Sequence, residues 1–221
     1  MINVAIDGPA GAGKSTIARR AAEKLGYIYA DTGALYRAVG LKFSKSGVDI
    51  SLGSDIKKVL SETEIDIRFI GGEQHVFLDG EDVSGLIRTP EASMTASAVS
   101  AKPAVREFLL EMQRKLAREN NVIMDGRDIG TVVLPNADVK IFLTASVKVR
   151  AERRFRELTE KGESVNFQDV YDDIEKRDYN DMHRAVAPLK QAEGAVLADT
   201  SDLSLDDSVA LVIKIISEGT R

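Results

Sequence analysis

Short apolar runs alternate with longer segments of helical periodicity along most of the chain. Residues Ile2 to Asp7 predict a short buried strand, and residues Lys14 to Leu25 predict a helix that ends at Gly26. The glycine-rich stretch between them, Gly8 to Gly13, predicts a loop. The chain is therefore expected to begin with a strand, a glycine loop and a helix.

The same alternation of strands and helices continues to the end of the chain. Further strands are predicted at Tyr27 to Ala30, Val122 to Met124, Val139 to Leu143 and Ala195 to Asp199. Further helices are predicted at Gly33 to Phe43, over most of Pro90 to Asn120 with a break near Pro103, and at Val147 to Lys161, Phe167 to His183 and Asp206 to Ser217. This pattern is typical of an α/β fold in which helices cover both faces of a parallel sheet. Ligands are expected at the carboxyl ends of its strands.

One region has a different pattern. Apolar and charged residues alternate from Ile65 to Phe69, Gly71 and Gly72 form a turn, and Val76 to Leu78 runs back. This pattern predicts a β-hairpin. Because it interrupts the alternation of strands and helices, we interpret it as part of an inserted lobe.

Composition and charge narrow the class of protein. A chain of 221 residues with 43% hydrophobic and 29% charged residues suits one globular α/β enzyme with an insert. A net charge of -5 argues against binding a nucleic acid polymer, and no apolar stretch approaches the ~18 residues of a membrane span. The chain has no cysteine, and its two histidines lie far apart. We expect a cytoplasmic protein without a thiolate metal site.

Residues Gly8 to Ser15 fit the phosphate-binding pattern G-x-x-x-x-G-K-[ST], with a strand before it and a helix after it. Small residues let backbone N–H groups surround phosphate oxygens, and the helix N-terminus adds positive potential. Lys14 can neutralise the β- and γ-phosphates of ATP, and the Ser15 hydroxyl can reach Mg²⁺. The ATP-binding residues expected here are Gly8, Pro9, Ala10, Gly11, Ala12, Gly13, Lys14, Ser15 and Thr16.

This loop alone does not distinguish kinases from GTPases, transport ATPases or nucleotide sensors. A GTPase would need an Asn-Lys-x-Asp guanine reader, and the chain has none. The D-x-x-G match from Asp82 to Gly85 lies in the hairpin region and is interpreted as a turn. Asp125 ends a predicted strand, where it could hold Mg²⁺ directly or through water. A capping or turn aspartate is the alternative.

Charged residues cluster on two of the predicted helices. Arg177, Asp181 and Arg184 are spaced so that they share one helix face, although a solvated salt-bridge face has the same pattern. Arg150 and Arg153 lie with Arg154 on the flank of the preceding helix. These guanidinium groups could swing over bound phosphates, and Arg153 is expected to bind ATP. A solvated helix face is again the alternative.

Four separated motifs now extend the comparison beyond the glycine loop. They are Gly8 to Ser15, Asp31-Thr32-Gly33-Ala34-Leu35-Tyr36-Arg37, Asp125-Gly126-Arg127-Asp128-Ile129-Gly130-Thr131 and Arg184-Ala185-Val186-Ala187-Pro188-Leu189. Together and in this order they resemble the bacterial cytidylate kinase family over almost the whole length. Glu81 to Gly85 and the segment from Lys161 to Phe167 also look like that family.

The resemblance implies a nucleoside monophosphate kinase fold in a single domain. Its parts would be a core at about residues 1–35, 90–150 and 185–221, a monophosphate-binding lobe with an insert at about 36–89, and a short lid at about 150–184. The hairpin at residues 65–78 falls where the family's insert belongs.

The resemblance also implies roles for individual side chains. Arg37, Arg127 and Arg184 would bind the acceptor phosphate, and Arg177 would lie close to the transferred group. The expected catalytic residues are Lys14, Arg127, Arg177 and Arg184. Planar guanidinium groups suit this task because they bind phosphate oxygens bidentately. A monophosphate with a second pKa near ~6 needs no general base.

Base and sugar recognition are implied by the same comparison. Asp128 would accept from the cytosine amino group, and Asp181 would hold the sugar hydroxyls. Ser97, Arg106 and Thr32 would address the rest of the base. Thr32 keeps the hydroxyl that serine supplies in many relatives.

The expected reaction is transfer of the ATP γ-phosphoryl group to CMP or dCMP, with Mg²⁺, by a monomer. The alternatives are a kinase for another monophosphate such as UMP, a small-metabolite kinase of the shikimate type, and a non-catalytic nucleotide-binding protein. The inserted hairpin and the motif from Gly126 to Asp128 argue against the first two. The set of arginines and the missing guanine reader argue against the third.

Overall fold

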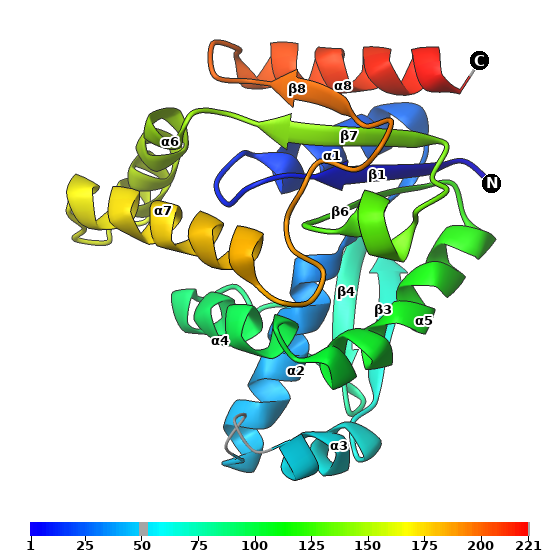
Figure 1. The fold of residues 1–221 in the computed structure, drawn as a ribbon, viewed down its shortest axis with the longest axis vertical. Coiled ribbons are helices and arrows are strands. Elements are labelled where there is room, and N and C mark those ends of the chain that lie inside the picture. Colours follow the sequence, from blue (N-terminus) through cyan, green and yellow to red (C-terminus); the bar gives the residue numbers. More distant parts are fainter. Residues whose placement is uncertain (49–52, 221) are drawn as a thin grey trace. The chain divides into compact units, whose positions relative to one another are not determined.

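The computed structural model describes residues 1–48 and 53–220. By its contacts the chain divides into two compact units. The first comprises Met1–Ile28 and Asn120–Arg221, and the second comprises Tyr29–Glu119. Figure 1 shows their elements in the colours of the sequence.

A five-stranded sheet has the strand order β2-β6-β1-β7-β8. Its strands are β1 (Asn3–Asp7), β2 (Ile28–Asp31), β6 (Val122–Gly126), β7 (Val139–Thr144) and β8 (Val196–Asp199). The β1 strand pairs in parallel with β6 and β7, and β7 pairs in parallel with β8. The carboxyl ends of β1, β6 and β7 therefore lie at one edge of the sheet, where β1 leads into the glycine loop.

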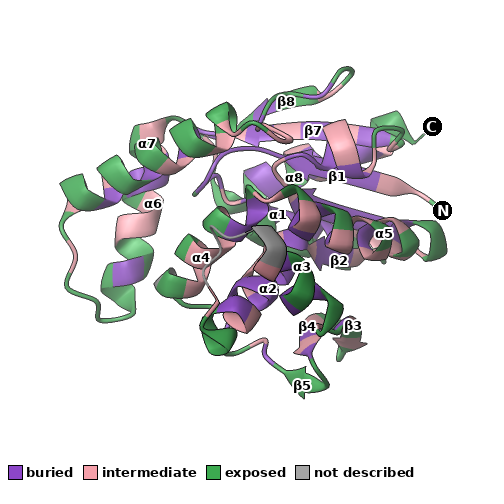
Figure 2. Cartoon of the chain, turned by 60° about the horizontal axis from the view of Figure 1, so that its bottom comes forward, coloured by how far each residue is buried: buried purple, intermediate pink, exposed green. Residues whose placement is uncertain are grey.

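The first unit also contains helices. They are α1 (Lys14–Leu25), α6 (Val147–Glu160), α7 (Phe167–His183), α8 (Leu205–Gly219) and the π-helical turn η1 (Ile129–Val133). The α8 helix packs against α1 and β7, and α6 packs against α7. Val4, Ala5 and Ile6 are buried on both faces of β1, as expected in a covered parallel sheet, and Figure 2 shows this burial.

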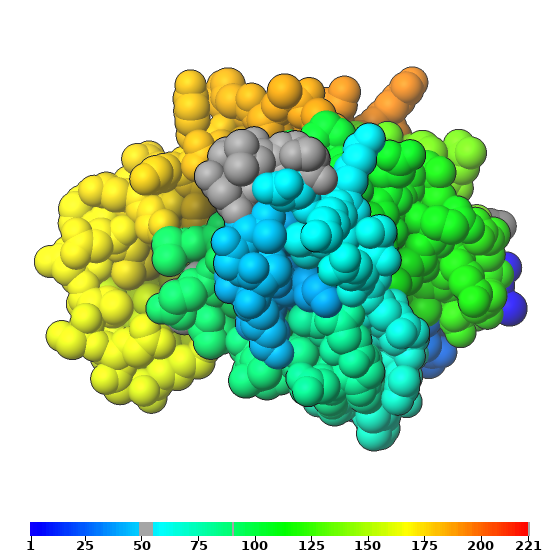
Figure 3. Space-filling model, turned by 90° about the horizontal axis from the view of Figure 1, so that it is seen from below, coloured from blue at the N-terminus to red at the C-terminus, as the bar shows by residue number. Residues whose placement is uncertain are grey.

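The second unit has its own core. It contains α2 (Thr32–Ser46), α3 (Gly53–Ser61), α4 (Pro90–Ser100) and α5 (Pro103–Glu119), with the antiparallel strands β3 (Ile65–Ile70), β4 (Glu73–Leu78) and β5 (Glu81–Asp82). Leu35 and Phe43 of α2 are buried in this core with Val76 of β4 and Leu109 of α5. A Cβ at Gly40 would lie 2.9 Å from Thr95 Cγ2, so glycine allows α2 to approach α4 closely. Figure 3 shows atoms of α2, α3 and the hairpin on the surface of this unit.

The α/β fold with its parallel sheet and the inserted hairpin are confirmed. The predicted strands and helices occur with small shifts of their ends, and α7 has the predicted bounds. Three elements were not predicted, namely α3, the two-residue strand β5 and η1. Asp82 therefore lies in a strand, and the predicted turn follows it. No described helix has the length and apolar character needed to cross a membrane.

Candidate active site

The loop after β1 depends on glycine for close packing and for its backbone angles. A Cβ at Gly8 would lie 1.9 Å from the carbonyl oxygen of Leu143 in β7, so no larger residue fits there. Gly11 and Gly13 have φ angles of 71° and 82°, which favour glycine. Helix α1 begins at Lys14 directly after this loop, with no acidic residue in its first turn. Its N-terminus is therefore suited to an anion.

Lys14 is buried at the start of α1, and its Nζ donates to the carbonyl oxygen of Pro9 at 2.7 Å. Burial and the nearby Arg127 lower the pKa of Lys14 to about 7, against the opposing effects of Asp125, Asp181 and Asp7. A phosphate group at this position would favour the charged ammonium form. An anionic ligand would therefore stabilise the protonated form of Lys14.

Two hard oxygen ligands meet beside this lysine. The Ser15 hydroxyl donates to Asp125 Oδ2 at 2.9 Å, which joins the start of α1 to the end of β6. Hydroxyl and carboxylate oxygens suit Mg²⁺, which usually takes one or two protein ligands and completes its shell with phosphate oxygens and water. No group of three or more potential metal-ligating His, Cys, Asp or Glu residues occurs in the described ranges, 1–48 and 53–220. The pair therefore fits an ion shared with a nucleotide.

Asp7 connects the end of β1 to the π-helical turn. Its Oδ1 accepts from the backbone N–H of Ile129 and its Oδ2 from that of Gly130, each at 2.7 Å. Burial raises the pKa of Asp7 to about 6, although these two hydrogen bonds lower it. Because the turn directly follows Asp128, Asp7 helps to set the backbone position of that residue. No pattern in the sequence predicts this contact.

Arginines and carboxylates from β6 and α7 form the next part of the site. Arg127 Nε donates to Asp181 Oδ2 at 2.8 Å. Burial acts to lower the pKa of Arg127, but Asp181, Asp125 and Asp178 raise it overall. Burial and the charge of Arg127 lower the pKa of Arg177, against the opposing effects of Asp173 and Asp181. Like charges held together in this way favour binding of an anion.

A second arginine–aspartate pair joins Asp128, directly before η1, to Arg184, directly after α7. Arg184 Nη2 lies 3.4 Å from Asp128 Oδ1, and both side chains are buried. Arg184 Nε donates to the carbonyl oxygen of Ala187 at 2.6 Å. Ala187 has a φ of 50° directly before Pro188, an unfavourable backbone conformation. This strained turn aims its carbonyl group at Arg184 and so holds the guanidinium in place.

The arginines of α6 differ from one another. Arg150 was expected on an open flank, free to move over phosphates, and this expectation is wrong because its side chain is buried against Asp178. Hydrogen bonds to Ala10 and Ala145 hold it there. Arg153 donates to the carbonyl oxygen of Thr200 at 2.7 Å. Its proposed contact with ATP stays a prediction.

In the second unit, Asp31 organises the start of α2. Its Oδ1 accepts from the backbone N–H of Ala34, and its Oδ2 accepts from Arg37 Nη2 at 2.7 Å. Gln74 of the hairpin binds the Asp31 backbone twice, since Oε1 accepts from the N–H at 2.7 Å and Nε2 donates to the carbonyl at 3.2 Å. Among residues 1–48 and 53–220, the buried Nε of Arg37 has no hydrogen-bond partner. That donor is suited to an anionic ligand.

The remaining predicted base-binding residues also belong to the second unit. The Arg106 guanidinium lies over the Tyr36 ring at 5.5 Å, and its Nη1 donates to the carbonyl oxygen of Ser100 at 3.2 Å. Thr32 is buried at the start of α2, and Ser97 lies partly buried in α4. The structure thus collects Lys14, Ser15, Asp125, Arg127, Asp128, Arg177, Asp181 and Arg184 in the first unit, and Thr32, Arg37, Ser97 and Arg106 in the second.

Comparison of the chain with known proteins identifies its family. The cytidylate kinase family matches residues 4–218. The chain belongs to the cytidylate kinase family. It is 54% identical over 214 residues to a cytidylate kinase of Caldicellulosiruptor bescii, covering 97% of this chain and 95% of that protein. It is 50% identical over 218 residues to a cytidylate kinase of Lactobacillus johnsonii, covering 99% and 95%.

Solved structures support the fold independently. The chain is similar to a shikimate kinase from Bacteroides thetaiotaomicron, with a TM-score of 0.50, 14% identity and 98% coverage of each chain. A protein from Eubacterium ventriosum, described as uncharacterized, matches with a TM-score of 0.52 at 12% identity, covering 98% of this chain and 99% of that one. At such identities the likeness concerns the fold alone. Membership of the cytidylate kinase family, by contrast, supports ATP-dependent phosphorylation of CMP or dCMP by this kinase.

Proposed function

We propose that the residues at the ends of β1 and β6 bind the triphosphate of ATP, whose γ-phosphoryl group is transferred to CMP or dCMP. The loop from Gly8 to Ser15, with Thr16, would surround the phosphates with backbone N–H groups. Lys14 would neutralise charge on the β- and γ-phosphates. The observation that carries this proposal is the position of the buried Lys14 at the start of α1, directly after the glycine loop and beside the Ser15–Asp125 pair. Arg127 also repels both Lys14 and Arg177, and a bound anion would relieve this repulsion.

We propose that the acceptor monophosphate is held by charged side chains of the predicted motifs. Arg37, Arg127 and Arg184 would bind the monophosphate oxygens, and the unpartnered Nε of Arg37 supports this role. In the structure Asp128 and Asp181 already contact Arg184 and Arg127. Since a carboxylate has several acceptor positions, each aspartate can hold its arginine and still bind the substrate.

Asp128 would then accept from the cytosine amino group, where uracil presents a carbonyl oxygen instead. Ser97, Arg106 and Thr32 would contact the rest of the base, and Asp181 the sugar hydroxyls. The contact between Arg106 and the Tyr36 ring supports a fixed orientation of that guanidinium in the second unit.

Phosphoryl transfer needs alignment and charge neutralisation more than proton transfer. An ionised oxygen of the acceptor phosphate forms a bond to the γ-phosphorus as the bond from that phosphorus to the β–γ bridging oxygen breaks, and ADP leaves. Lys14 and the arginines Arg127, Arg177 and Arg184 would offset the charge on the transferred group. No side chain is required to remove a proton, since the acceptor is already ionised.

Ser15 and Asp125 are proposed to hold Mg²⁺, Asp125 directly or through water. The ion would supply further positive charge to the β- and γ-phosphates. Arg153 is proposed to contact ATP from α6. The division into a core, a monophosphate-binding lobe at 36–89 and a lid at 150–184, the monomeric state and the cytoplasmic location also belong to this proposal.

The decisive experiment measures ADP release with a panel of monophosphates, namely CMP, dCMP, UMP and AMP. Turnover is expected to be fastest with CMP or dCMP and to require Mg²⁺. Faster turnover with another monophosphate would support the alternative kinase. ATP binding without turnover on any acceptor would support the non-catalytic alternative.

A further inference from the structure

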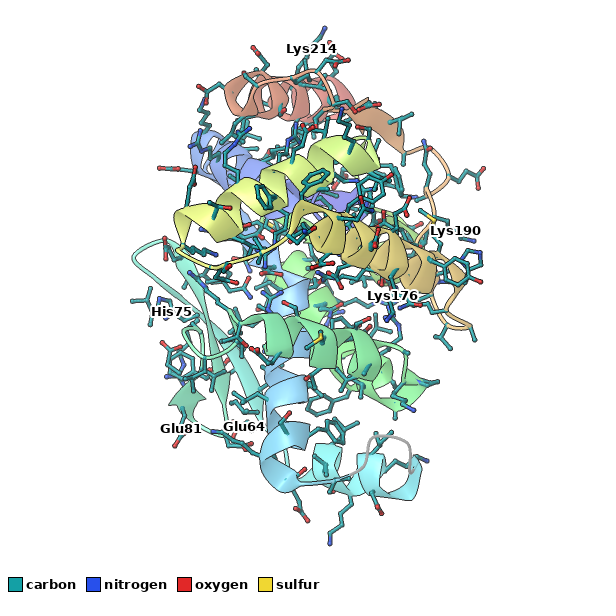
Figure 4. The ribbon with its side chains drawn as sticks, turned by 90° about the vertical axis from the view of Figure 1, so that its left-hand side faces the viewer. Glu64, His75, Glu81, Lys176, Lys190 and Lys214 are labelled. Carbon is teal, nitrogen blue, oxygen red and sulfur yellow. The ribbon has the colours of Figure 1, made fainter. Side chains whose placement is uncertain are left out.

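A buried ion pair joins the two helices that follow β7. Arg150 Nη1 of α6 lies 2.7 Å from Asp178 Oδ2 of α7, and the side chains are only 4% and 10% exposed. The helices also share a small apolar cluster that includes Ala151 and Ile174. Figure 4 shows α6 and α7 packed side by side, with the exposed Lys176 pointing away from this contact.

Both members of the pair bind the same residue of the glycine loop. Arg150 Nη1 donates to the carbonyl oxygen of Ala10 at 2.7 Å, and Asp178 Oδ1 accepts from the backbone N–H of Ala10 at 3.1 Å. Arg150 Nε donates to the carbonyl oxygen of Ala145 at 2.8 Å, which anchors the guanidinium to the end of β7. A Cβ at Gly11 would lie 3.3 Å from Arg150 Cβ, so α6 lies directly against the loop.

These contacts determine the orientation of two successive peptide planes. Because the chain has no cis peptide among its described residues, the N–H and the C=O of each peptide point in opposite directions. Fixing the Ala10 carbonyl toward Arg150 therefore directs the Gly11 N–H away from Arg150. Fixing the Ala10 N–H toward Asp178 likewise directs the Pro9 carbonyl away, where it accepts from Lys14 Nζ.

We propose that Arg150 and Asp178 are positioning residues for ATP, which hold the peptides on both sides of Ala10 in the phosphate-binding orientation without contacting the substrate. This inference rests on the proposed role of the Gly8 to Ser15 loop in binding ATP. Arg150 Nε and Nη1 are directed at protein acceptors, which distinguishes them from the donors of an arginine that binds phosphate.

Stability alone gives a weak reason for such a pair. Burying two charges costs solvation free energy, and well-packed apolar residues in their place are often equally stable. A pair that orients the backbone of a ligand-binding loop has a reason to be charged, because apolar side chains cannot bind the N–H and the C=O of Ala10.

The direction in which Asp178→Asn changes the ATP dissociation constant tests this proposal. Removing a negative charge close to a polyanion site should by Coulomb's law alone tighten ATP binding. If Asp178 positions the loop, the ATP dissociation constant instead rises by about tenfold, the loss expected when one charge-assisted hydrogen bond is misaligned. Titration calorimetry on the full chain, with urea unfolding to verify the fold, measures both quantities. Tighter or unchanged ATP binding by folded Asp178→Asn would overturn the proposal.

A double variant separates positioning from stability. Arg150→Met with Asp178→Leu removes both charges and leaves neither unpaired, so we expect a folded protein. Because the Ala10 N–H and C=O lose their partners, we expect somewhat lower stability and ATP binding at least about tenfold weaker. The matched control is Lys148→Met with Glu152→Leu, which removes an exposed ion pair of the same helix at 4.0 Å. The control should bind ATP like wild type. Wild-type affinity in the folded Arg150/Asp178 double variant would also overturn the proposal.

If the double variant does not fold, Arg150→Lys provides the test of positioning. It keeps the charge, but one ammonium group lacks the planar fork that binds Ala10, Ala145 and Asp178 together. We expect a several-fold rise in the KM for ATP with the KM for CMP changed less, and equal effects on both would contradict the inference. Wild-type turnover of CMP is measured first, because its absence would refute the proposed function itself.

Discussion

The ionisation of Asp7 should be visible in the stability of the protein. Its carboxyl group is buried, with a pKa raised from 3.8 to about 6. Between these two values the folded state keeps a proton that the unfolded state has lost. Raising the pH through this window therefore lowers the free energy of unfolding. The stabilising contribution is complete below pH 3.8 and lost above pH 6.

The magnitude follows from the size of the shift. About two pKa units correspond to about 3 kcal/mol over the whole window. Roughly 2 kcal/mol of this should fall between about pH 4.5 and about pH 7.5, where the chain can be studied without strong acid.

Asp7→Asn isolates the effect, because the amide cannot ionise. The amide also offers only one acceptor to the N–H groups of Ile129 and Gly130, which adds an offset of about 1–3 kcal/mol that does not depend on pH. Urea unfolding of both proteins at the two pH values gives the comparison. The stability advantage of wild type over Asp7→Asn should shrink by about 2 kcal/mol as the pH rises. An advantage that stays constant would refute the assignment of a raised pKa to Asp7.

Three substitutions test the proposed site directly. Lys14→Ala should lower kcat/KM by about a hundredfold or more in the ADP-release assay, because it removes a buried charge from the phosphates, and retention of a tenth of the activity would contradict this role. Asp128→Ala should reduce the preference for CMP over UMP by about a hundredfold, measured as the ratio of the two kcat/KM values, and an unchanged ratio would mean that another group reads the base. Gln74→Ala removes both hydrogen bonds to the Asp31 backbone and should raise the KM for CMP by about three- to tenfold with the KM for ATP unchanged, whereas the neighbouring His75→Ala should alter neither.

The elements that sequence patterns predicted are those whose own residues specify them. Helix α7 has a cap at Asn166 and ends beside Arg184, and β1 contains the short apolar run from Val4 to Ile6. The π-helical turn is different, because the five residues Ile129–Val133 carry no periodic pattern. Asp7, more than a hundred positions earlier, binds its first two N–H groups. Such a contact has no local signature in the sequence.

Arg150 and Arg153 show the same limit on a single helix. Their spacing alone does not reveal that the first is buried against the glycine loop and the second is bonded to Thr200. Ala151, the neighbour of Arg150, is 0% exposed, so this part of α6 is enclosed. Neither residue's burial can be inferred from the spacing of the arginines.

Residues proposed to touch the substrate could be selected from the sequence because their chemistry is set by the ligand. Phosphate requires cationic donors, so Lys14 stands out in its motif, whereas the resemblance to a known family singled out Asp128 as the acceptor for an amino group. Positioning residues are selected by a different requirement, because they bind the protein backbone and not the ligand. Asp7, Gln74 and the Arg150–Asp178 pair bind backbone N–H and C=O groups, which every non-proline residue carries. The residue whose backbone is bound can have any side chain, so its type does not reveal the contact. These contacts become visible only when the fold brings distant segments together.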